Sequence, residues 1–176
     1  MTKLHNGAPI ELDVKAVADD GSFHGYASTF NVRDRGGDIV KPGAFTTSLA
    51  KYPAARVKML WQHDTSEPVG TWTSFTEDAK GLKAEGRFIL ATAKGREAHA
   101  LVKAGAVDGL SIGFRTIRDE MDRKSGARLL HGIELREVSI VTFPMNEDAT
   151  VTGVKSTPDN SFRALVEAIN AGRAHF

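Results

Sequence analysis

Short runs of β-forming residues recur through most of this chain, and they constrain its fold more than any other feature. Seven such runs, each bounded by turn-forming residues, cover residues 10–17, 24–30, 57–61, 70–75, 82–90, 110–117 and 129–141. Two segments, 42–50 and 93–104, have helical character, and Thr92 before the second is a candidate N-cap. Because the strands do not alternate with long helices, a doubly wound parallel sheet is disfavoured. We expect a β-dominated α+β fold, a small and mostly antiparallel β-barrel of about seven strands with helices outside it.

The composition excludes several classes of protein. The chain has no cysteine, which removes disulfide scaffolds, cysteine-ligated zinc, iron–sulfur clusters and thiol nucleophiles. Its 23 basic and 22 acidic residues are interspersed and give a net charge of +1, so bulk binding of nucleic acid is not expected. No stretch approaches the roughly 18 apolar residues of a membrane span, and the N-terminus lacks the apolar core of a signal peptide. We expect a soluble, unsecreted protein without a membrane partner.

The length of 176 residues favours one domain with a short tail. A polar, proline-containing stretch at 155–160 marks the boundary, so the predicted domain is 1–154 and the predicted tail is 155–176. In the tail, apolar residues recur at helical spacing and predict a short amphipathic helix that packs on the domain or on a partner: Phe162, Leu165, Val166 and Ile169.

The sequence offers a first candidate catalytic residue in His63, which ends an apolar run within Trp61-Gln62-His63-Asp64. A histidine at the end of a strand can reach a cleft, and imidazole titrates near neutrality, which suits a general base for a hydroxyl nucleophile. The following residues, 67–70, predict a turn into the next strand. A surface histidine beside a turn would give the same pattern.

Ser111 is the candidate nucleophile, since residues 109–113 match the G-x-S-x-G pattern of α/β-hydrolases. That hydrolase motif needs a helix after the serine, whereas residues 112–117 continue as an alternating strand. Alternation places Ser111 and Gly113 on the polar face of this strand, which would leave room for a substrate backbone. A solvated strand serine beside flexible glycines would look the same.

Glu137 interrupts the apolar pattern of the strand predicted at 133–141. A carboxylate among apolar residues needs a partner, either an imidazole that it orients or a basic side chain in a salt bridge. Ser139 is a second hydroxyl that could act as nucleophile, and His131 is a second group that could orient an imidazole. The pattern of the sequence leaves these alternatives open.

We expect no metal site and no cofactor. Residues 31–40 carry two aspartates around a glycine pair, but the regular oxygen ligands and closing glutamate of a calcium loop are missing, so the segment predicts a turn. The six histidines show no HExxH or other paired-ligand spacing.

Taken in order, several segments resemble the prohead (capsid maturation) protease family of HK97-like tailed bacteriophages, whose fold is similar to that of herpesvirus assemblins. The resemblance covers most of the chain and rests on FHGYASTF at 23–30, GDIVKPGAF at 37–45, WQHD at 61–64 with PVG at 68–70, LSIGF at 110–114, and LREVSIV at 135–141 with Pro144. Each piece is weak alone, and it is their order and spacing that carry the resemblance.

The resemblance implies a serine endopeptidase whose histidine and serine lie on strands of the barrel. Matched by position, His63 would be the general base and Ser111 the nucleophile, while Glu137 would take the orienting place that a second histidine has in assemblins. Assemblins also resemble one another in having an arginine near the oxyanion site, but residues 142–147 contain none. Backbone amides of 142–146 or the side chain of Asn146 are the expected oxyanion donors instead.

The resemblance also implies the substrate and the setting. The expected partners are the major capsid protein with its scaffolding segment, and the protease itself through autocleavage and self-association. The expected location is the bacterial host cytoplasm, inside the assembling prohead. Two other functions compete: a non-catalytic capsid assembly or scaffold-binding protein that keeps the barrel, and a generic esterase.

Overall fold

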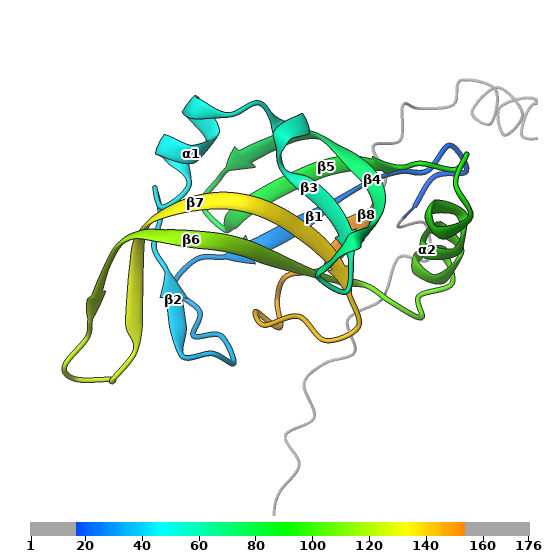
Figure 1. Cartoon of the computed structure of the whole chain (residues 1–176). Helices are drawn as coiled ribbons and strands as arrows, with labels where there is room; N and C mark the ends of the chain where they lie inside the picture. Colours follow the sequence, from blue (N-terminus) through cyan, green and yellow to red (C-terminus); the bar gives the residue numbers. More distant parts are fainter. Residues whose placement is uncertain (1–16, 154–176) are drawn as a thin grey trace, which may run out of the picture.

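The computed structural model describes residues 17–153, and it is dominated by one curled β-sheet (Figure 1). The elements in chain order are β1 (Ser22–Thr29), β2 (Asp38–Val40), α1 (Thr46–Lys51), the short 3-10 helix η1 (Ala54–Arg56), β3 (Lys58–Trp61), β4 (Asp64–Glu77), β5 (Gly81–Phe88), α2 (Ala93–Lys103), β6 (Gly109–Met121), β7 (Arg128–Val141) and β8 (Val151–Gly153). Of the strand predicted at 10–17 only Val17 is described, and it forms an isolated bridge with Phe23. The division at residue 154 and the predicted tail helix lie outside the described residues.

The order of the strands confirms the predicted barrel. Strands follow one another as β2, β7, β3, β4, β5, β1 and β8, and β6 pairs with the other edge of β7. All pairings are antiparallel except those that β2 and β3 make with β7. The two ends of the curled sheet are joined by backbone hydrogen bonds, from the Leu110 amide to the Ala149 carbonyl (2.8 Å) and from the Val151 amide to the Asp108 carbonyl (2.9 Å). Ser111 therefore lies one residue beyond the seam that closes the barrel.

Aromatic and aliphatic side chains fill the inside of the barrel. Trp72, Phe23 and Phe88 are almost fully buried, and their rings contact one another edge to face and stacked. Burial of each such side chain stabilises the fold by roughly 1.5–3 kcal/mol. Gly86 makes room for this cluster, because a Cβ there would lie 2.7 Å from Cε3 of Trp72. The core thus fixes β1, β4 and β5 as the rigid wall opposite the β6–β7 pair.

Two helices flank the barrel. The N-cap prediction for α2 is confirmed, since Thr92 Oγ1 accepts a hydrogen bond from the amide of Gly95 at 3.0 Å. The other helix begins at Thr46 instead of the predicted residue 42, because Gly43 has a φ of +85° that no α-helix can contain. Among the described residues, neither helix has the length and apolar run needed to cross a membrane.

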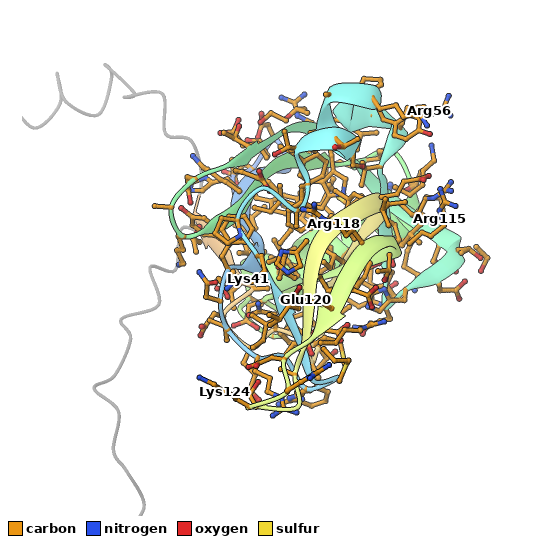
Figure 2. The ribbon with its side chains drawn as sticks, turned by 90° about the vertical axis from the view of Figure 1, so that its left-hand side faces the viewer. Lys41, Arg56, Arg115, Arg118, Glu120 and Lys124 are labelled. Carbon is orange, nitrogen blue, oxygen red and sulfur yellow. The ribbon has the colours of Figure 1, made fainter. Side chains whose placement is uncertain are left out.

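Three further predictions need correction. The turn expected at 67–70 is wrong: these residues belong to β4, which accommodates Pro68 where its pairing with β3 is irregular. The segment 31–40 is a turn only as far as residue 37, because 38–40 pair with β7 as β2. β6 extends past its predicted end at residue 117 to Met121, and together with β7, which begins within one residue of its predicted start, it forms a hairpin that projects from the barrel (Figures 1 and 2). Figure 2 shows Lys124 at the tip of this hairpin, with Arg118 and Glu120 along it.

Candidate active site

His63 lies in a tight turn, not on a strand. Trp61 pairs with Asp64, so Gln62 and His63 are the two central residues of the β3–β4 hairpin, with φ values of 52° and 62°. Positive φ at both central positions is the geometry of a type I′ hairpin turn, which usually employs asparagine or glycine. Residues held there without being glycine store backbone strain, and such strain clusters at functional sites.

Gln62 fastens this turn to the end of β7. Its backbone amide donates to the carbonyl of Ile140 (2.9 Å), and its side chain exchanges hydrogen bonds with Thr142, donating to Oγ1 (2.9 Å) and accepting from the amide (3.3 Å). The turn is therefore held over β7, the strand that carries Glu137. The sequence analysis did not single out Gln62. The pattern that could have indicated its role is a tight turn built from Gln62 and His63 without a glycine.

Glu137 is the partner of His63. Nδ1 of His63 lies 2.6 Å from Oε1 of Glu137, and the two side chains are 43% and 15% exposed. The hydrogen bond that His63 donates to Glu137 raises the pKa of His63 above its usual 6.5, assisted by the negative charge of Glu137 and opposed by partial burial. With Nδ1 engaged, Nε2 is the ring nitrogen available for proton transfer.

Ser111 shares a face of the β6–β7 pair with Glu137. Ser111 pairs directly with Ser139, and Gly113 pairs with Glu137, and directly opposed residues of an antiparallel pair point to the same side. Ser111 is almost fully buried but lines a cavity, and its hydroxyl forms no hydrogen bond with another residue in the range 17–153. Two residues of strand, about 7 Å, separate it from the position opposite Glu137. The structure thus brings His63 and Glu137 into contact and places Ser111 on the same face.

A cavity of about 120 Å³ opens beside Ser111. It lies between the segment 31–40, which contains a turn and β2, and the loop at 142–148. A hydrogen bond from the Arg35 amide to the Met145 carbonyl (2.9 Å) joins the two segments. Its walls are mostly apolar, with a few polar groups: Ala27, Ser28, Val32, Asp34, Gly36, Asp38, Val40, Leu110, Ser111, Ile112, Phe114, Met145 and Asn146. Small cavities of this kind next to a hydroxyl can receive a side chain or backbone segment of a substrate.

The two aspartates of the segment 31–40 have structural roles: Asp34 closes the turn, and Asp38 joins β2 to β7. Asp34 Oδ1 accepts from the amide of Asp38 (2.8 Å), and Asp38 forms a two-pronged ion pair with Arg128 (2.8 and 2.5 Å). No three histidine, aspartate or glutamate side chains between residues 17 and 153 converge in a way that could hold a metal ion.

The alternatives that the sequence left open occupy different places. Ser139 is fully buried, does not line the cavity, and donates its hydroxyl proton to Oε2 of Glu137 at 2.5 Å. His131 lies six residues before Glu137, about 20 Å along the strand. Its nearest carboxylate is that of Glu120, at 3.6 Å on the projecting hairpin. The geometry therefore favours Glu137 over His131 as the group that orients His63, and Ser111 over Ser139 as the reactive hydroxyl.

Asn146 is buried and holds the loop after β7 against β1. Its Oδ1 accepts from Oγ1 of Thr29 (2.9 Å) and from the amide of Asp148 (3.1 Å), while Nδ2 donates to the carbonyl of Thr29 (3.1 Å). A carboxamide nitrogen carries two protons, so one donor remains on a side chain that also lines the cavity beside Ser111.

Comparison with known families gives this geometry a context. The model of a family described as caudovirus prohead serine protease matches residues 10–162. The chain belongs to this family. The prohead protease of Enterobacteria phage HK97 is 39% identical over 150 residues, which cover 83% of this chain and 66% of that protein. The prohead protease of Escherichia phage T5 is 30% identical over 158 residues, 85% of this chain and 73% of its own length. The chain thus spans just under two thirds of the HK97 protein.

Other relatives extend the comparison to a capsid protein and to solved structures. A capsid polyprotein of Pseudomonas phage PAJU2 is 34% identical over 167 residues, which cover 91% of this chain and 24% of the polyprotein. The capsid assembly protease of bacteriophage T4 superposes with a TM-score of 0.54 at 15% identity, covering 70% of this chain and 82% of its own. The KSHV protease, solved with a hexapeptide phosphonate inhibitor, gives a TM-score of 0.50 at 12% identity, and the match covers 85% of this chain and 76% of the KSHV chain. These two structural similarities confirm the predicted assemblin-like fold of this chain.

Proposed function

We propose that this prohead protease family member is an endopeptidase that removes the scaffolding segment of a phage capsid protein, and cleaves itself, during prohead maturation. The observation that carries the proposal is the 2.6 Å contact of His63 with Glu137 on the face that also presents Ser111. The relatives named as prohead proteases and as a capsid polyprotein support the substrate class.

In the first half of the reaction, Ser111 Oγ attacks the carbonyl carbon of the scissile peptide bond. Nε2 of His63 takes the hydroxyl proton as the C–O bond forms, while Nδ1–H donates to Glu137 and the carboxylate stabilises the imidazolium. The tetrahedral intermediate then expels the amine, which leaves with the proton from Nε2. An acyl-enzyme on Ser111 remains.

In the second half, a water molecule replaces the departed amine. His63 Nε2 accepts one of its protons as the oxygen attacks the ester carbonyl, and returns that proton to Ser111 Oγ when the acyl bond breaks. The released product carries a new carboxyl group. His63 must be neutral at the start of each half, so the raised pKa of His63 moves the acid limb of activity to higher pH than an unperturbed imidazole would give.

For the oxyanion we propose donors from the loop at 142–146, including the second proton of Asn146 Nδ2. The loop lies against the cavity that holds Ser111, and the anchoring of Asn146 to Thr29 would keep the donor preorganised, which is what makes such donors effective.

The proposed setting is the interior of the assembling prohead in the host cytoplasm, with self-association of the protease there. A high local concentration inside a shell shifts a weak association toward the oligomer. Neither cofactor nor metal has a role in the proposed steps.

The site favours an enzyme over a non-catalytic assembly protein, because a binding role needs neither a strained histidine turn nor a carboxylate fixed against it. It also disfavours a hydrolase of the nucleophile-elbow type, since Ser111 lies inside strand β6 and no helix follows it directly.

The test is co-expression of this chain with its cognate capsid protein, followed by intact mass spectrometry of the assembled shells. A defined truncation of the capsid protein with the unchanged chain, absent with Ser111→Ala, is expected. Ser66→Ala is the matched control, because Ser66 lies in β4, which does not pair with β6, and its side chain bonds only to Asp64. Full-length capsid protein in shells that contain the unchanged chain would instead support the non-catalytic role.

A further inference from the structure

The carboxylate of Glu137 is held from more than one side. Oε1 contacts His63 and Oε2 accepts the proton of Ser139. Below it lies Gly113, its direct partner across the β6–β7 pair. The space above Gly113, which the sequence suggested for a substrate backbone, is therefore filled by Glu137.

Glycine is the one residue type that fits at position 113 beneath this carboxylate. A Cβ at position 113 would lie 2.7 Å from Cδ and 2.8 Å from Cγ of Glu137, and closer still to Oε1. Gly113 has no positive φ, so an alanine there would fit the strand backbone. The close contacts of such a Cβ are all with the Glu137 side chain, so an alanine at position 113 would displace that flexible side chain and leave the backbone in place.

Gly113 leaves space for the Glu137 side chain, whereas Ser139 holds it by a hydrogen bond. Its side chain is fully buried beneath the site, where a hydroxyl needs a partner, and the partner is Oε2 of Glu137. A charge-assisted hydrogen bond of this kind is about twice as strong as a neutral one. Ser139 therefore limits rotation of the carboxylate and leaves Oε1 turned toward His63.

We infer that Gly113 and Ser139 form a carboxylate support: they are positioning residues that hold Glu137 in the orientation in which it fixes His63. The inference rests on the proposed function, and it gives both residues a role in turnover without contact with substrate. The second glycine of the G-x-S-x-G pattern thus makes space for the acidic member of the site, in place of the tight strand-to-helix turn that it serves in α/β-hydrolases.

The first test is Gly113→Ala, assayed on a peptide that spans the cleavage site found in the capsid protein. A catalytic group displaced by about 1 Å loses on the order of 100-fold in rate, so we expect kcat to fall about 10- to 100-fold with little change in KM. Gly132→Ala is the matched control on the same hairpin, because its Cβ would meet only ordinary contacts, the nearest at 3.5 Å.

The second test is Ser139→Ala, with Ser48→Ala as its control. Ser48 is also buried, and its hydroxyl accepts from the amide of Leu135 on β7 without contacting Glu137. We expect a similar loss in kcat for Ser139→Ala and none for Ser48→Ala when both are assayed below their unfolding temperatures.

A readout independent of turnover separates positioning from general stability. The hydrogen bond to Glu137 and the negative charge of Glu137 raise the pKa of His63, so freeing the carboxylate should lower that pKa toward 6.5. NMR titration of the His63 ring in Gly113→Ala and Ser139→Ala measures this directly, and the acid limb of kcat/KM should move to lower pH with it.

The outcomes distinguish the two ideas. If both variants keep the His63 pKa and kcat of the parent while Ser111→Ala is inactive, the carboxylate support is refuted and the protease stands. If the unchanged chain cleaves neither the capsid protein nor the peptide, the proposed function fails, whereas a lowered His63 pKa in the two variants would still show that they hold Glu137.

Discussion

Replacement of Glu137 by glutamine tests the centre of the proposed mechanism. Glutamine has nearly the same shape as glutamate, but one of its two terminal groups is a donor. Ser139 donates to Oε2 in the parent, so its proton will select the carboxamide oxygen. The NH₂ group then faces Nδ1 of His63, at the place where Oε1 lies 2.6 Å away.

The size of the effect follows from the tautomer that this arrangement imposes. An NH₂ group donates to an unprotonated Nδ1, so the ring proton moves to Nε2, and Nε2 can no longer accept the proton of Ser111. A wrong tautomer in an otherwise intact triad lowers kcat by about 10⁴-fold. We expect a loss of about 10³- to 10⁴-fold here, which corresponds to roughly 4–5.5 kcal/mol of barrier.

The assay is single-turnover cleavage of the capsid-derived peptide across a pH series, with Glu134→Gln as the matched control. Glu134 lies three residues earlier on β7 and pairs with Arg115 and Arg136 at 2.6 Å each. It does not contact His63. A loss of less than about tenfold for Glu137→Gln, or an acid limb that stays where it is in the parent, would refute the role of Glu137 as the group that orients His63.

Three other predictions concern stability and the oxyanion. Thr92→Ala removes the cap of α2 and should lower the free energy of unfolding by about 1 kcal/mol in urea denaturation, with the cleavage rate unchanged. Asn146→Ala should lower kcat by about 10²-fold if its amide stabilises the oxyanion. Thr29→Val loses the same side-chain hydrogen bond and should lower mainly the free energy of unfolding. Equal kcat values in the two variants would remove Asn146 from the mechanism. Because the folded-state pKa of His63 is raised, its contribution to stability is complete below the unfolded value of about 6.5 and is lost as pH rises through the folded value. The difference in unfolding free energy between the parent and His63→Gln should therefore shrink as pH rises from about 6.5 through the folded-state pKa of His63. A difference that grew with pH would contradict the ion pair of His63 with Glu137.

The long strands were predictable because their alternation records which face is buried. β5, β6 and β7 were each placed to within a few residues at one end or both. The three-residue strands β2 and β8 were not predicted, since so short a segment becomes a strand only through its tertiary partners, β7 and β1. The same limit applied to Gly43, whose left-handed backbone cannot be inferred from a helical pattern of apolar residues.

Part of the candidate site was predictable for a similar reason. Glu137 was noticeable because it places a charged group on a strand otherwise patterned for burial, and Ser111 because it lies in a G-x-S-x-G match. The conformation of His63 was not, because Gln62-His63 lacks the residues that usually mark a tight hairpin turn. The role of Gly113 was not either: a glycine in a strand indicates that something approaches closely, but only the pairing of β6 with β7 shows that it is Glu137.

The seam of the barrel also sets when the site can form during synthesis. Leu110, next to Ser111, donates its amide to Ala149, and β1 pairs with β8, so contacts made by the first strand wait for the last one. Such distant pairings are slow to form because a long loop must close first. A chain emerging from the ribosome can build the hydrophobic wall of β1, β4 and β5 early. Asp108 and Leu110, just before Ser111, gain these backbone partners only once residues 149–151 are free, so a nascent chain shorter than this lacks the seam beside the nucleophile.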